Sequence, residues 1–462
     1  MQITPFGAAK TVTGSCYSIT AEKNKVLVDC GMFQGSKKEE KLNYLDFGFE
    51  AKRYIALFLT HAHLDHCGRI PLLVKRGFKG KIYATSATRD LAFVVMMDSA
   101  KIAAHDISWE NKKRAKQNLP PREPIYAEKD VHNAMKLFQT VEYHDGIYVN
   151  SHIRGEFFDA GHILGASSLK LEIVEEGKKT IVVFSGDLGQ KNTPIVKDPE
   201  FIDKADYVFI ESTYGDRLHE HTVKRGKKFL EIIQATYDKG GKLMIPSFAI
   251  ERAQELLYDI NGFMEKHLME PETVYLDSPM AIKATEVFRK HPEDYDAEIK
   301  KIFDQGDDPF NFEGLKFSRT VEESKAINNT DYPIIIIAGS GMCTAGRIKH
   351  HIKNHIDDPK NTILFVGYQV FGTLGYWIKK GEKRIRLLGT EMEVKAKVET
   401  IDSFSAHADY EGLLEWLQAF KQKPKKVFII HGEEDTQKEF AKKVKKIGLD
   451  THIPSRCEKI NL

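Results

Sequence analysis

Short apolar runs that stop on a polar, chemically active side chain recur along the chain. The run Tyr54–Thr60 has the length and content of a buried strand, and it leads into three histidines and an aspartate within the six residues 61–66. The residues at which such predicted strands stop are Asp29, His61, His162, Asp187, Glu211 and His431. Because buried sheets carry their chemistry at the carboxyl ends of the strands, we expect these side chains to form one site.

The spacing of apolar residues predicts strands and helices in alternation. Short strands are expected at Ser15–Thr20 and Lys25–Asp29, a long helix at Thr88–Ile107 and a further helix at Tyr126–Thr140. Between residues 211 and 392 strands and helices follow one another regularly. That order is typical of a parallel sheet covered on both faces, so this region is predicted to be a second α/β domain.

Helix-start signals mark this second domain. Ser247 is predicted to cap one helix, and Ser278 to cap another whose first residue is Pro279. The turn Gly339–Gly346 leads into a third helix, but Thr344 stands where a dinucleotide-binding fingerprint needs glycine. Two interpretations stay open: a tight packing turn, or a helix N-terminus whose N–H groups bind a phosphate.

Composition describes an ordinary globular protein. The length suggests about three domains, with 42% of the 462 residues hydrophobic, 29% charged and a net charge of +2. A surface that binds nucleic acid must therefore be local. Basic residues gather at Arg347–Lys353, Lys379–Arg386 and Lys421–Lys426, where they form either a solvated surface or contacts to phosphates.

Cysteines and the N-terminus bear on location. The five cysteines are scattered and odd in number, so we expect reduced thiols and no disulfide framework. The first residues lack the pattern of a signal peptide, and no apolar stretch reaches the length of a membrane span. The protein is expected in the cytoplasm, without a membrane partner.

Seven side chains have the chemistry and number that two metal ions need. The predicted ligands are His61, His63 and His162 for one Zn²⁺, Asp65, His66 and His431 for the other, and Asp187 as a bridge between them. Bridging carboxylates also suit Mn²⁺. Two metal ions about 3.5–4 Å apart clamp the attacking and leaving oxygens of a displacement, so hydrolysis is the expected chemistry.

Asp29 ends a strand in which a carboxylate is disfavoured. Two interpretations stay open for it. It caps a turn, or it accepts a hydrogen bond from a metal-bound histidine and orients that ring.

These residues resemble the motifs of a known family. The cluster His61–His66, with His162 and Asp187 at later strand ends, resembles the metallo-β-lactamase superfamily. The stretches Glu211-Ser-Thr-Tyr-Gly and Ser405-Ala-His-Ala-Asp409 look like motifs of its β-CASP branch of nucleases, which includes RNase J and the cleavage and polyadenylation endonuclease. The resemblance covers nearly the whole chain and is nearest to the compact prokaryotic members.

The resemblance implies a zinc-dependent ribonuclease that hydrolyses RNA phosphodiester bonds by a two-metal mechanism, in RNA processing or decay. Cleavage is expected to be endonucleolytic, 5′–3′ exonucleolytic or both. A histidine at position 431 is associated within the family with RNA and not with DNA. The residues expected to be catalytic are His407, Glu211, Asp65 and Asp29.

The fold class implied is α/β: a four-layer αββα metallo-β-lactamase fold with an inserted β-CASP domain of mainly parallel sheet. The first domain is expected to comprise residues 1–210 and 393–462, and the insert residues 211–392. Substrate contacts are expected from Ser340, Gly341, Ser247 and Arg252.

Two other functions remain open. One is a hydrolase of small esters or thioesters, against which the large insert and the stretch Ser405–Asp409 count. The other is a non-catalytic RNA-binding scaffold, against which the full set of ligands counts. A homodimer is a further expectation.

Overall fold

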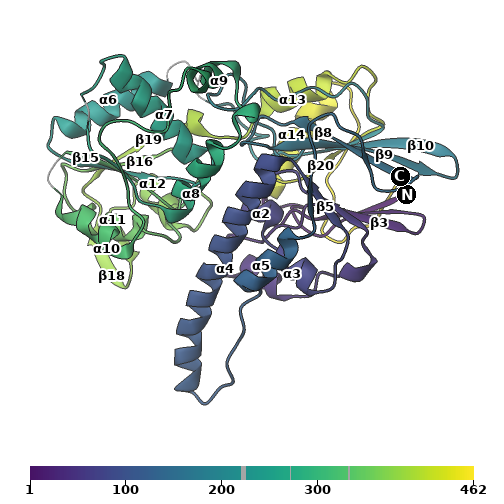
Figure 1. Ribbon diagram of the computed structural model, residues 1–462, viewed down its shortest axis with the longest axis horizontal. Helices are drawn as coiled ribbons and strands as arrows, with labels where there is room; N and C mark the ends of the chain where they lie inside the picture. The colour runs from purple at the N-terminus through teal and green to yellow at the C-terminus, as the bar shows by residue number, and fades with distance from the viewer. Residues whose placement is uncertain (220–224, 271, 331–332) are drawn as a thin grey trace. The chain divides into compact units, whose positions relative to one another are not determined.

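The computed structural model describes residues 1–219, 225–270, 272–330 and 333–462 (Figure 1). The chain folds into two compact units. Unit 1 comprises Met1–Lys191, Asp198–Leu218 and His407–Leu462, and unit 2 comprises Asn192–Lys197 and His219–Ala406. The borders expected after residues 210 and 392 stay a prediction.

Unit 1 contains two seven-stranded sheets. The first has the order β22 (Ile460–Asn461), β1 (Gln2–Pro5), β2 (Tyr17–Ala21), β3 (Asn24–Val28), β4 (Ala56–Phe58), β5 (Lys81–Ala84), β6 (Phe138–Thr140). Its strands are antiparallel from β22 to β3 and parallel from β3 to β6. The carboxyl ends of β3 and β4, which carry Asp29 and His61, therefore lie side by side.

The second sheet repeats this plan. Its order is β21 (Thr451–His452), β20 (Lys426–Ile429), β11 (Tyr207–Ile210), β10 (Lys178–Phe184), β9 (Ser167–Glu175), β8 (Ile153–Asp159), β7 (Ile147–Tyr148). Strands β10, β11, β20 and β21 are parallel, while β8 and β10 are both antiparallel to β9. The strands that precede His162, Asp187, Glu211 and His431 consequently end at the same edge.

The two sheets pack face to face through aromatic side chains. Phe58 of the first sheet lies edge-on to Phe157 of the second, with 6.3 Å between the ring centroids, and Tyr17 lies 5.5 Å from Phe184. Within the second sheet, paired positions carry a stack of rings in which Phe209 lies 4.7 Å from Phe184. Such pairs contribute about 0.5–1.5 kcal/mol each beyond the area they bury.

Helices complete unit 1. The remaining bounds are α1 (Lys37–Glu40), α2 (Leu64–Cys67), α3 (Ile70–Lys75), α4 (Ser86–Ala115), α5 (Glu128–Met135), α13 (Tyr410–Gln418) and α14 (Glu434–Lys446). Figure 1 shows α3, α4 and α5 beside the first sheet and α13 and α14 beside the second. The four-layer αββα prediction is confirmed.

Two sequence predictions in this unit differ from the structure. Helix α4 continues to Ala115, past the expected end at Ile107, because the polar segment that follows is rich in good helix formers and has no proline before Pro120. The expected helix Tyr126–Thr140 is a short helix followed by strand β6, because the last residues pair with β5. Tertiary pairing overrides the local helix signal there.

Unit 2 is built on one six-stranded sheet whose pairs are all parallel. The order is β14 (Leu315–Phe317), β13 (Val274–Leu276), β15 (Ile334–Ala338), β12 (Lys242–Pro246), β16 (Thr362–Phe365), β19 (Lys397–Thr400). Alternate residues of β15 belong to two separate cores, since Ile335 and Ile337 face one and Ile334 and Ile336 the other. A parallel sheet needs this cover on both faces, and the predicted second α/β domain is confirmed.

Helices cover both faces of this sheet. One core takes side chains from α6 (Arg225–Tyr237), α7 (Arg252–Glu265) and α8 (Pro279–Phe288). The other takes side chains from α11 (Ile348–His355) and α12 (Leu374–Lys379). The remaining elements are α9 (Ala297–Asp304), α10 (Val321–Ala326) and the hairpin of β17 (Arg384–Leu387) and β18 (Thr390–Glu393).

The two helix caps predicted in unit 2 have different outcomes. Ser278 caps α8 by accepting a hydrogen bond from Ala281 N at 3.2 Å, with Pro279 at the first helical position, as expected. The prediction for Ser247 is wrong. Helix α7 begins at Arg252, and the Ser247 hydroxyl donates to the carbonyl of Phe248 at 2.8 Å instead.

Within the described ranges, no helix is both long and apolar enough to cross a lipid bilayer.

Candidate metal centre

The six residues His61–His66 turn from a strand into a short helix. They follow β4, and His63 begins α2, where His66 N and Cys67 N both donate to the carbonyl of His63 at 2.9 Å. A Cβ at Gly31 would lie 1.5 Å from the carbonyl oxygen of Asp65, so the neighbouring strand end approaches as only glycine allows. The turn sends its four polar side chains into a single buried cluster.

A first set of donor atoms comes from His61, His63, His162 and Asp187, all within 4.8 Å of one another. His63 Nδ1 lies 3.1 Å from His61 Nε2 and 3.2 Å from His162 Nε2. Asp187 Oδ2 lies 3.5 Å from His61 Nε2 and 3.7 Å from His162 Nε2. Ligand atoms around a tetrahedral Zn²⁺ with bonds near 2.0–2.1 Å are about 3.3 Å apart, so this set fits such an ion.

A second set comes from Asp65, His66 and His431. His431 Nε2 lies 3.3 Å from His66 Nε2 and 3.4 Å from Asp65 Oδ2. Its other nitrogen, Nδ1, lies 3.1 Å from the hydroxyl of Thr213. The spacing of these donor atoms again matches a small cation.

Asp187 faces both sets. While its Oδ2 is directed at the first set, its Oδ1 lies 3.4 Å from His66 Nε2 and 3.5 Å from His431 Nδ1. Oδ1 is buried and has no hydrogen-bond partner of good geometry among the described residues. A buried carboxylate oxygen is costly unless a charge compensates it, which a shared cation would do.

Burial sets the charge state of the histidines. It lowers the pKa of His63 to about 4 and that of His61 well below its ordinary value, so both rings are neutral, which is the form that binds metal. For His66 burial acts in the same direction, but the carboxylates of Asp187 and Asp29 outweigh it and raise the pKa of the ring. The carboxylates around the second set therefore favour a positive charge at the point where its donor atoms meet.

Asp29 makes the contacts that both of its open interpretations require. Its Oδ1 accepts a hydrogen bond from Thr60 N at 2.8 Å, which fixes the strand end, and its Oδ2 accepts one from His66 Nδ1 at 2.8 Å. The latter contact leaves His66 Nε2 to face the donor set. Asp29 has a left-handed backbone with φ of 58°. It acts through His66, so we describe it as a positioning residue.

Glu211 and His407 form a pair beside the two sets. The buried carboxylate of Glu211 accepts hydrogen bonds from His407 Nδ1 at 3.0 Å and from Leu188 N at 2.7 Å. Burial opposes a charge on the ring, but the carboxylate of Glu211 outweighs it and raises the pKa of His407 to about 9. His407 is thus a cation at neutral pH, and its ring centroid lies 4.5 Å from that of His162.

The four residues expected to bind substrate lie in unit 2. Ser247, Ser340 and Gly341 follow the parallel strands β12 and β15 at neighbouring carboxyl ends. Ser340 accepts hydrogen bonds from Thr344 N and Ala345 N, so it occupies N–H groups that we expected to bind a phosphate.

Arg252 is the first residue of α7 and does not lie at a strand end. It is buried, pairs with Glu255 and lies over the ring of Phe404, so its burial argues against contact with a polymer.

Two hydroxyl residues of the site were not anticipated. Thr60 donates to Asp29 Oδ2 at 2.9 Å and lies 3.1 Å from His61 Nδ1, while Thr213 holds His431. Thr60 directly precedes the cluster His61–His66 and Thr213 lies within the stretch Glu211–Gly215, and this placement is the one signal in the sequence that points to them. Hydroxyl side chains are too common for that signal to be specific.

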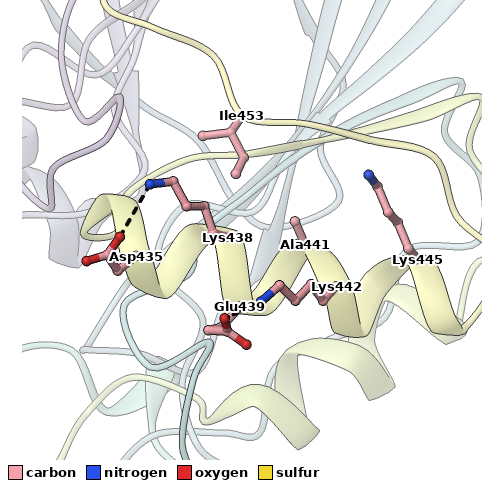
Figure 2. A pocket seen from close by; sticks show the side chains of 7 residues that line it. All are labelled: Asp435, Lys438, Glu439, Ala441, Lys442, Lys445 and Ile453. Atoms are coloured by element: carbon pink, nitrogen blue, oxygen red, sulfur yellow. Dashed lines mark hydrogen bonds and ion pairs between the residues drawn. The ribbon is translucent and has the colours of Figure 1, made fainter.

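A shallow pocket on α14, shortly after His431, is separate from this centre (Figure 2). Its lining includes Lys438, Lys442 and Ile453 and none of the predicted site residues. Lys438 pairs with Asp435 at 3.3 Å, and Lys442 pairs with Glu439. The charges of Lys438 and Lys442 are therefore compensated within their own helix.

Three family models match the chain. The metallo-β-lactamase superfamily matches residues 9–218, the Beta-Casp domain residues 253–378, and a Zn-dependent metallo-hydrolase RNA specificity domain residues 391–454. The last of these ranges includes His407 and His431.

Relatives and a solved structure agree with the models. The chain is 39% identical to Ribonuclease TTHA0252 of Thermus thermophilus, over 94% of each chain. It is 32% identical to an RNase J-like protein of Methanocaldococcus jannaschii over 97% of each, and 33% identical to transcription termination factor FttA of Methanosarcina mazei, over 100% of this chain and 72% of FttA.

A crystal structure of a protein of unknown function from Enterococcus faecalis shares the fold. Its TM-score is 0.55 at 13% identity, with 100% of this chain and 99% of that chain covered. Since the relative that is 39% identical matches over 94% of each chain, the chain belongs to the β-CASP ribonucleases of the metallo-β-lactamase superfamily.

Proposed function

We propose that the protein hydrolyses phosphodiester bonds of RNA at the histidine–aspartate centre of unit 1, with two Zn²⁺ ions. The observation that carries the proposal is the position of Asp187, whose two oxygens face two separate sets of donor atoms. A single tetrahedral ion binds four ligands, so seven such side chains are too many for one ion. Five of the seven are histidines, which favours Zn²⁺ over Mn²⁺.

When bound, the two ions would supply a Lewis acid for the phosphate and lower the pKa of a bound water. The protein's own residues would orient the metal-binding rings and protonate the leaving oxygen. Asp29 fixes the ring of His66, and Thr213 contacts Nδ1 of His431. Because Nδ1 of His407 is held by Glu211, any proton that His407 gives to a leaving oxygen comes from Nε2. Burial opposes a charge on this ring, but the carboxylate of Glu211 raises the pKa of His407 and so favours the protonated form.

RNA as the substrate class is supported by the names of the relatives, which include a ribonuclease and an RNase J-like protein. It is also supported by the match to an RNA specificity domain across His407 and His431. The bases of RNA could approach the carboxyl edge of the parallel sheet in unit 2, where Ser340 and Gly341 lie.

Three further proposals concern the domain borders, the location of the protein and its oligomeric state. We keep residue 210 as the proposed start of the insert, and we place its end beyond the expected residue 392, because β19 pairs with β16 in the sheet of unit 2. The site of action is taken as the cytoplasm, in keeping with four buried cysteines that are free: Cys16, Cys30, Cys67 and Cys343. The homodimer remains a prediction that sedimentation of the purified protein would check.

The test compares cleavage of end-labelled RNA and of DNA with the same sequence by Zn²⁺-loaded protein. We expect RNA cleavage by the wild type and at least about a 1000-fold loss in the double variant Asp65→Ala, His66→Ala, because one ligand set is lost. A matched control is His105→Ala, an exposed histidine on α4. Metal analysis should give two Zn²⁺ per wild-type chain.

Other outcomes identify the alternatives. RNA that is bound in a gel shift but left intact, by wild type and double variant alike, indicates a scaffold. Hydrolysis of a small thioester with RNA left intact indicates the small-ester hydrolase. An active protein with one Zn²⁺ or fewer contradicts the two-metal mechanism.

A further inference from the structure

Three aromatic side chains gather on the surface of unit 2, at the start of α12. Phe371 is 74% exposed and Trp377 39% exposed. Their ring centroids are 5.7 Å apart, and Tyr376 lies 5.2 Å from Phe371 and 5.1 Å from Trp377, in edge-to-face geometry. We call these three residues the aromatic platform. A phenylalanine this exposed is unusual, since such rings are ordinarily buried.

The aromatic platform is held in place by the backbone around it. Thr373 caps α12 by accepting a hydrogen bond from Tyr376 N at 3.2 Å. Gln369 Nε2 donates to the carbonyl of Gly341 at 2.9 Å, and Gly375 N donates to Met342 O at 3.2 Å. A Cβ at Gly375 would lie 1.9 Å from Gln369 Oε1. The rings are thus fixed to the turn in which Ser340 and Gly341 lie.

Basic side chains follow the aromatic platform along the chain. Residues 379–386 contain five basic side chains and one acidic one. Lys380 Nζ lies 5.7 Å from the ring centroid of Tyr376, while Arg384, which pairs with Glu391 at 3.8 Å, remains 77% exposed. Open aromatic faces within a basic surface are what a single nucleic acid strand needs, because its bases stack and its phosphates are anions.

A second copy of the chain fits this surface less well. An isologous contact places a patch against itself, which would bring the same cations of residues 379–386 face to face. Like charges opposite one another are unfavourable in an interface. An unpaired RNA strand, whose phosphates complement those cations, is the better occupant.

We propose that the aromatic platform stacks unpaired bases of an RNA strand on unit 2. The proposal rests on the proposed function, because it takes RNA as the ligand. Stacking requires an exposed base face, so single strands should bind and blunt duplexes should not use the platform. The platform would hold a strand without reading its sequence, since every base offers such a face.

The test measures binding of the full-length protein to a fluorescein-labelled 15-nucleotide oligo(A) with phosphorothioate linkages, which resist cleavage. We expect Phe371→Ala to raise Kd for this strand about 10-fold, and Kd for a blunt duplex to stay unchanged. Phe371→Leu, which keeps an apolar side chain without a ring, should behave like Phe371→Ala, and Phe371→Trp should bind like the wild type. Leu268→Ala, at another exposed apolar residue of unit 2, is the matched control.

Activity on bis-p-nitrophenyl phosphate, which has no base to stack, should be the same in all of these variants. If the wild type cleaves RNA while Phe371→Ala and Phe371→Leu bind oligo(A) as tightly as it does, the platform proposal is overturned and the proposed function stands. If the wild type neither cleaves nor binds RNA, both are overturned. If Phe371→Ala instead converts a dimer to a monomer in sedimentation, the surface joins two copies and the platform proposal is again wrong.

Discussion

At the scale of single residues, the pair of Glu211 and His407 shows how a buried carboxylate prepares a histidine. Glu211 fixes which nitrogen of the ring is directed away from it and keeps the ring protonated. Asp29 does the corresponding work for His66, whose protonated Nδ1 it holds. In both cases the carboxylate orients an imidazole.

Replacing Glu211 by glutamine should separate this role from metal binding. The amide retains most of the shape but loses the charge, so the imidazolium of His407 loses a charged hydrogen bond worth about 1.5–3 kcal/mol. We expect kcat for RNA cleavage to fall about 10- to 100-fold, with KM and zinc content nearly unchanged. Steady-state kinetics and metal analysis give the three quantities.

The control for this variant is Glu293→Gln in unit 2, which alters an exposed carboxylate that lies 2.8 Å from His291 Nδ1. It should leave kcat unchanged. A loss of zinc in Glu211→Gln that parallels the loss of kcat would mean that Glu211 maintains the metal centre and not His407.

His61, His162, Asp187 and His431 could be predicted from sequence because each stands where an apolar run stops. His63, Asp65 and His66 could be predicted because they are crowded into the same six residues as His61. The contributions of Thr60 and Thr213 could not, because a hydroxyl becomes specific only when the fold brings a ring nitrogen within hydrogen-bond distance.

At the scale of elements, the carboxyl end of β13 carries a buried charged network. Asp277 accepts hydrogen bonds from Ser324 of α10 at 2.6 Å, from His351 of α11 at 2.7 Å and from Arg347 at 2.7 Å. Burial alone would raise the pKa of Asp277, but these bonds outweigh it and lower the pKa to about 2. The carboxylate thereby ties two helices to the sheet of unit 2.

This shift predicts how the stability of unit 2 depends on pH. The folded-state pKa lies below the ordinary value of 3.8, so the stabilisation is fully present above about pH 4 and is lost as the pH falls through about 2. We expect Asp277→Asn to lower the free energy of unfolding by about 2 kcal/mol at pH 6, with a difference that shrinks below pH 4. Urea unfolding at pH 6, 4 and 3 measures it.

Asp402→Asn, which removes an exposed ion pair with Lys379, is the control and should change stability by less than about 1 kcal/mol. A difference for Asp277→Asn that stays constant from pH 6 to pH 3 would contradict an ionised Asp277 as its source.

The starts of α8 and α7 differ in how well they can be predicted from the sequence. The cap at Ser278 needs only its own helix, and it was predicted correctly. The start of α7 was not, because the five residues from Ser247 to Glu251 form a turn before Arg252, with Glu251 in a left-handed conformation at φ 65°. Their conformation depends on packing against Gly341 and Gly367, which approach Phe248 closely.

At the scale of the whole molecule, the metal centre joins distant parts of unit 1. Its donor residues extend from His61 to His431, and none of the seven belongs to unit 2. Removal of zinc should therefore destabilise unit 1 alone, because the ions bind its folded state and not its unfolded chain.

Calorimetry of the holoprotein with and without EDTA tests this. We expect the transition of unit 1 to move to lower temperature, by the equivalent of about 4 kcal/mol or more if zinc is held at 1,000 times its Kd, and the transition of unit 2 to stay in place. The double variant Asp65→Ala, His66→Ala should respond less to EDTA. Equal movement of both transitions would contradict an effect confined to one unit.

The covered parallel sheet of unit 2 could be predicted from pattern, because fully buried runs such as β15 are typical of such sheets. The four-layer αββα arrangement of unit 1 was implied by the resemblance of its motifs to the metallo-β-lactamase superfamily, because no local pattern shows how two sheets pack. The borders of the units depend on contacts such as the bridge between Gly189 and His407, which no local pattern reveals.

Strand β20 lies beside β11 in the second sheet, although the whole of His219–Ala406 separates them along the chain. A ribosome that has released β11 must still synthesise that intervening segment before the partner strand emerges. Throughout this interval one edge of the sheet is open, and His431 has not been made. The second sheet and the donor set that includes His431 are therefore completed only after His219–Ala406 has been synthesised.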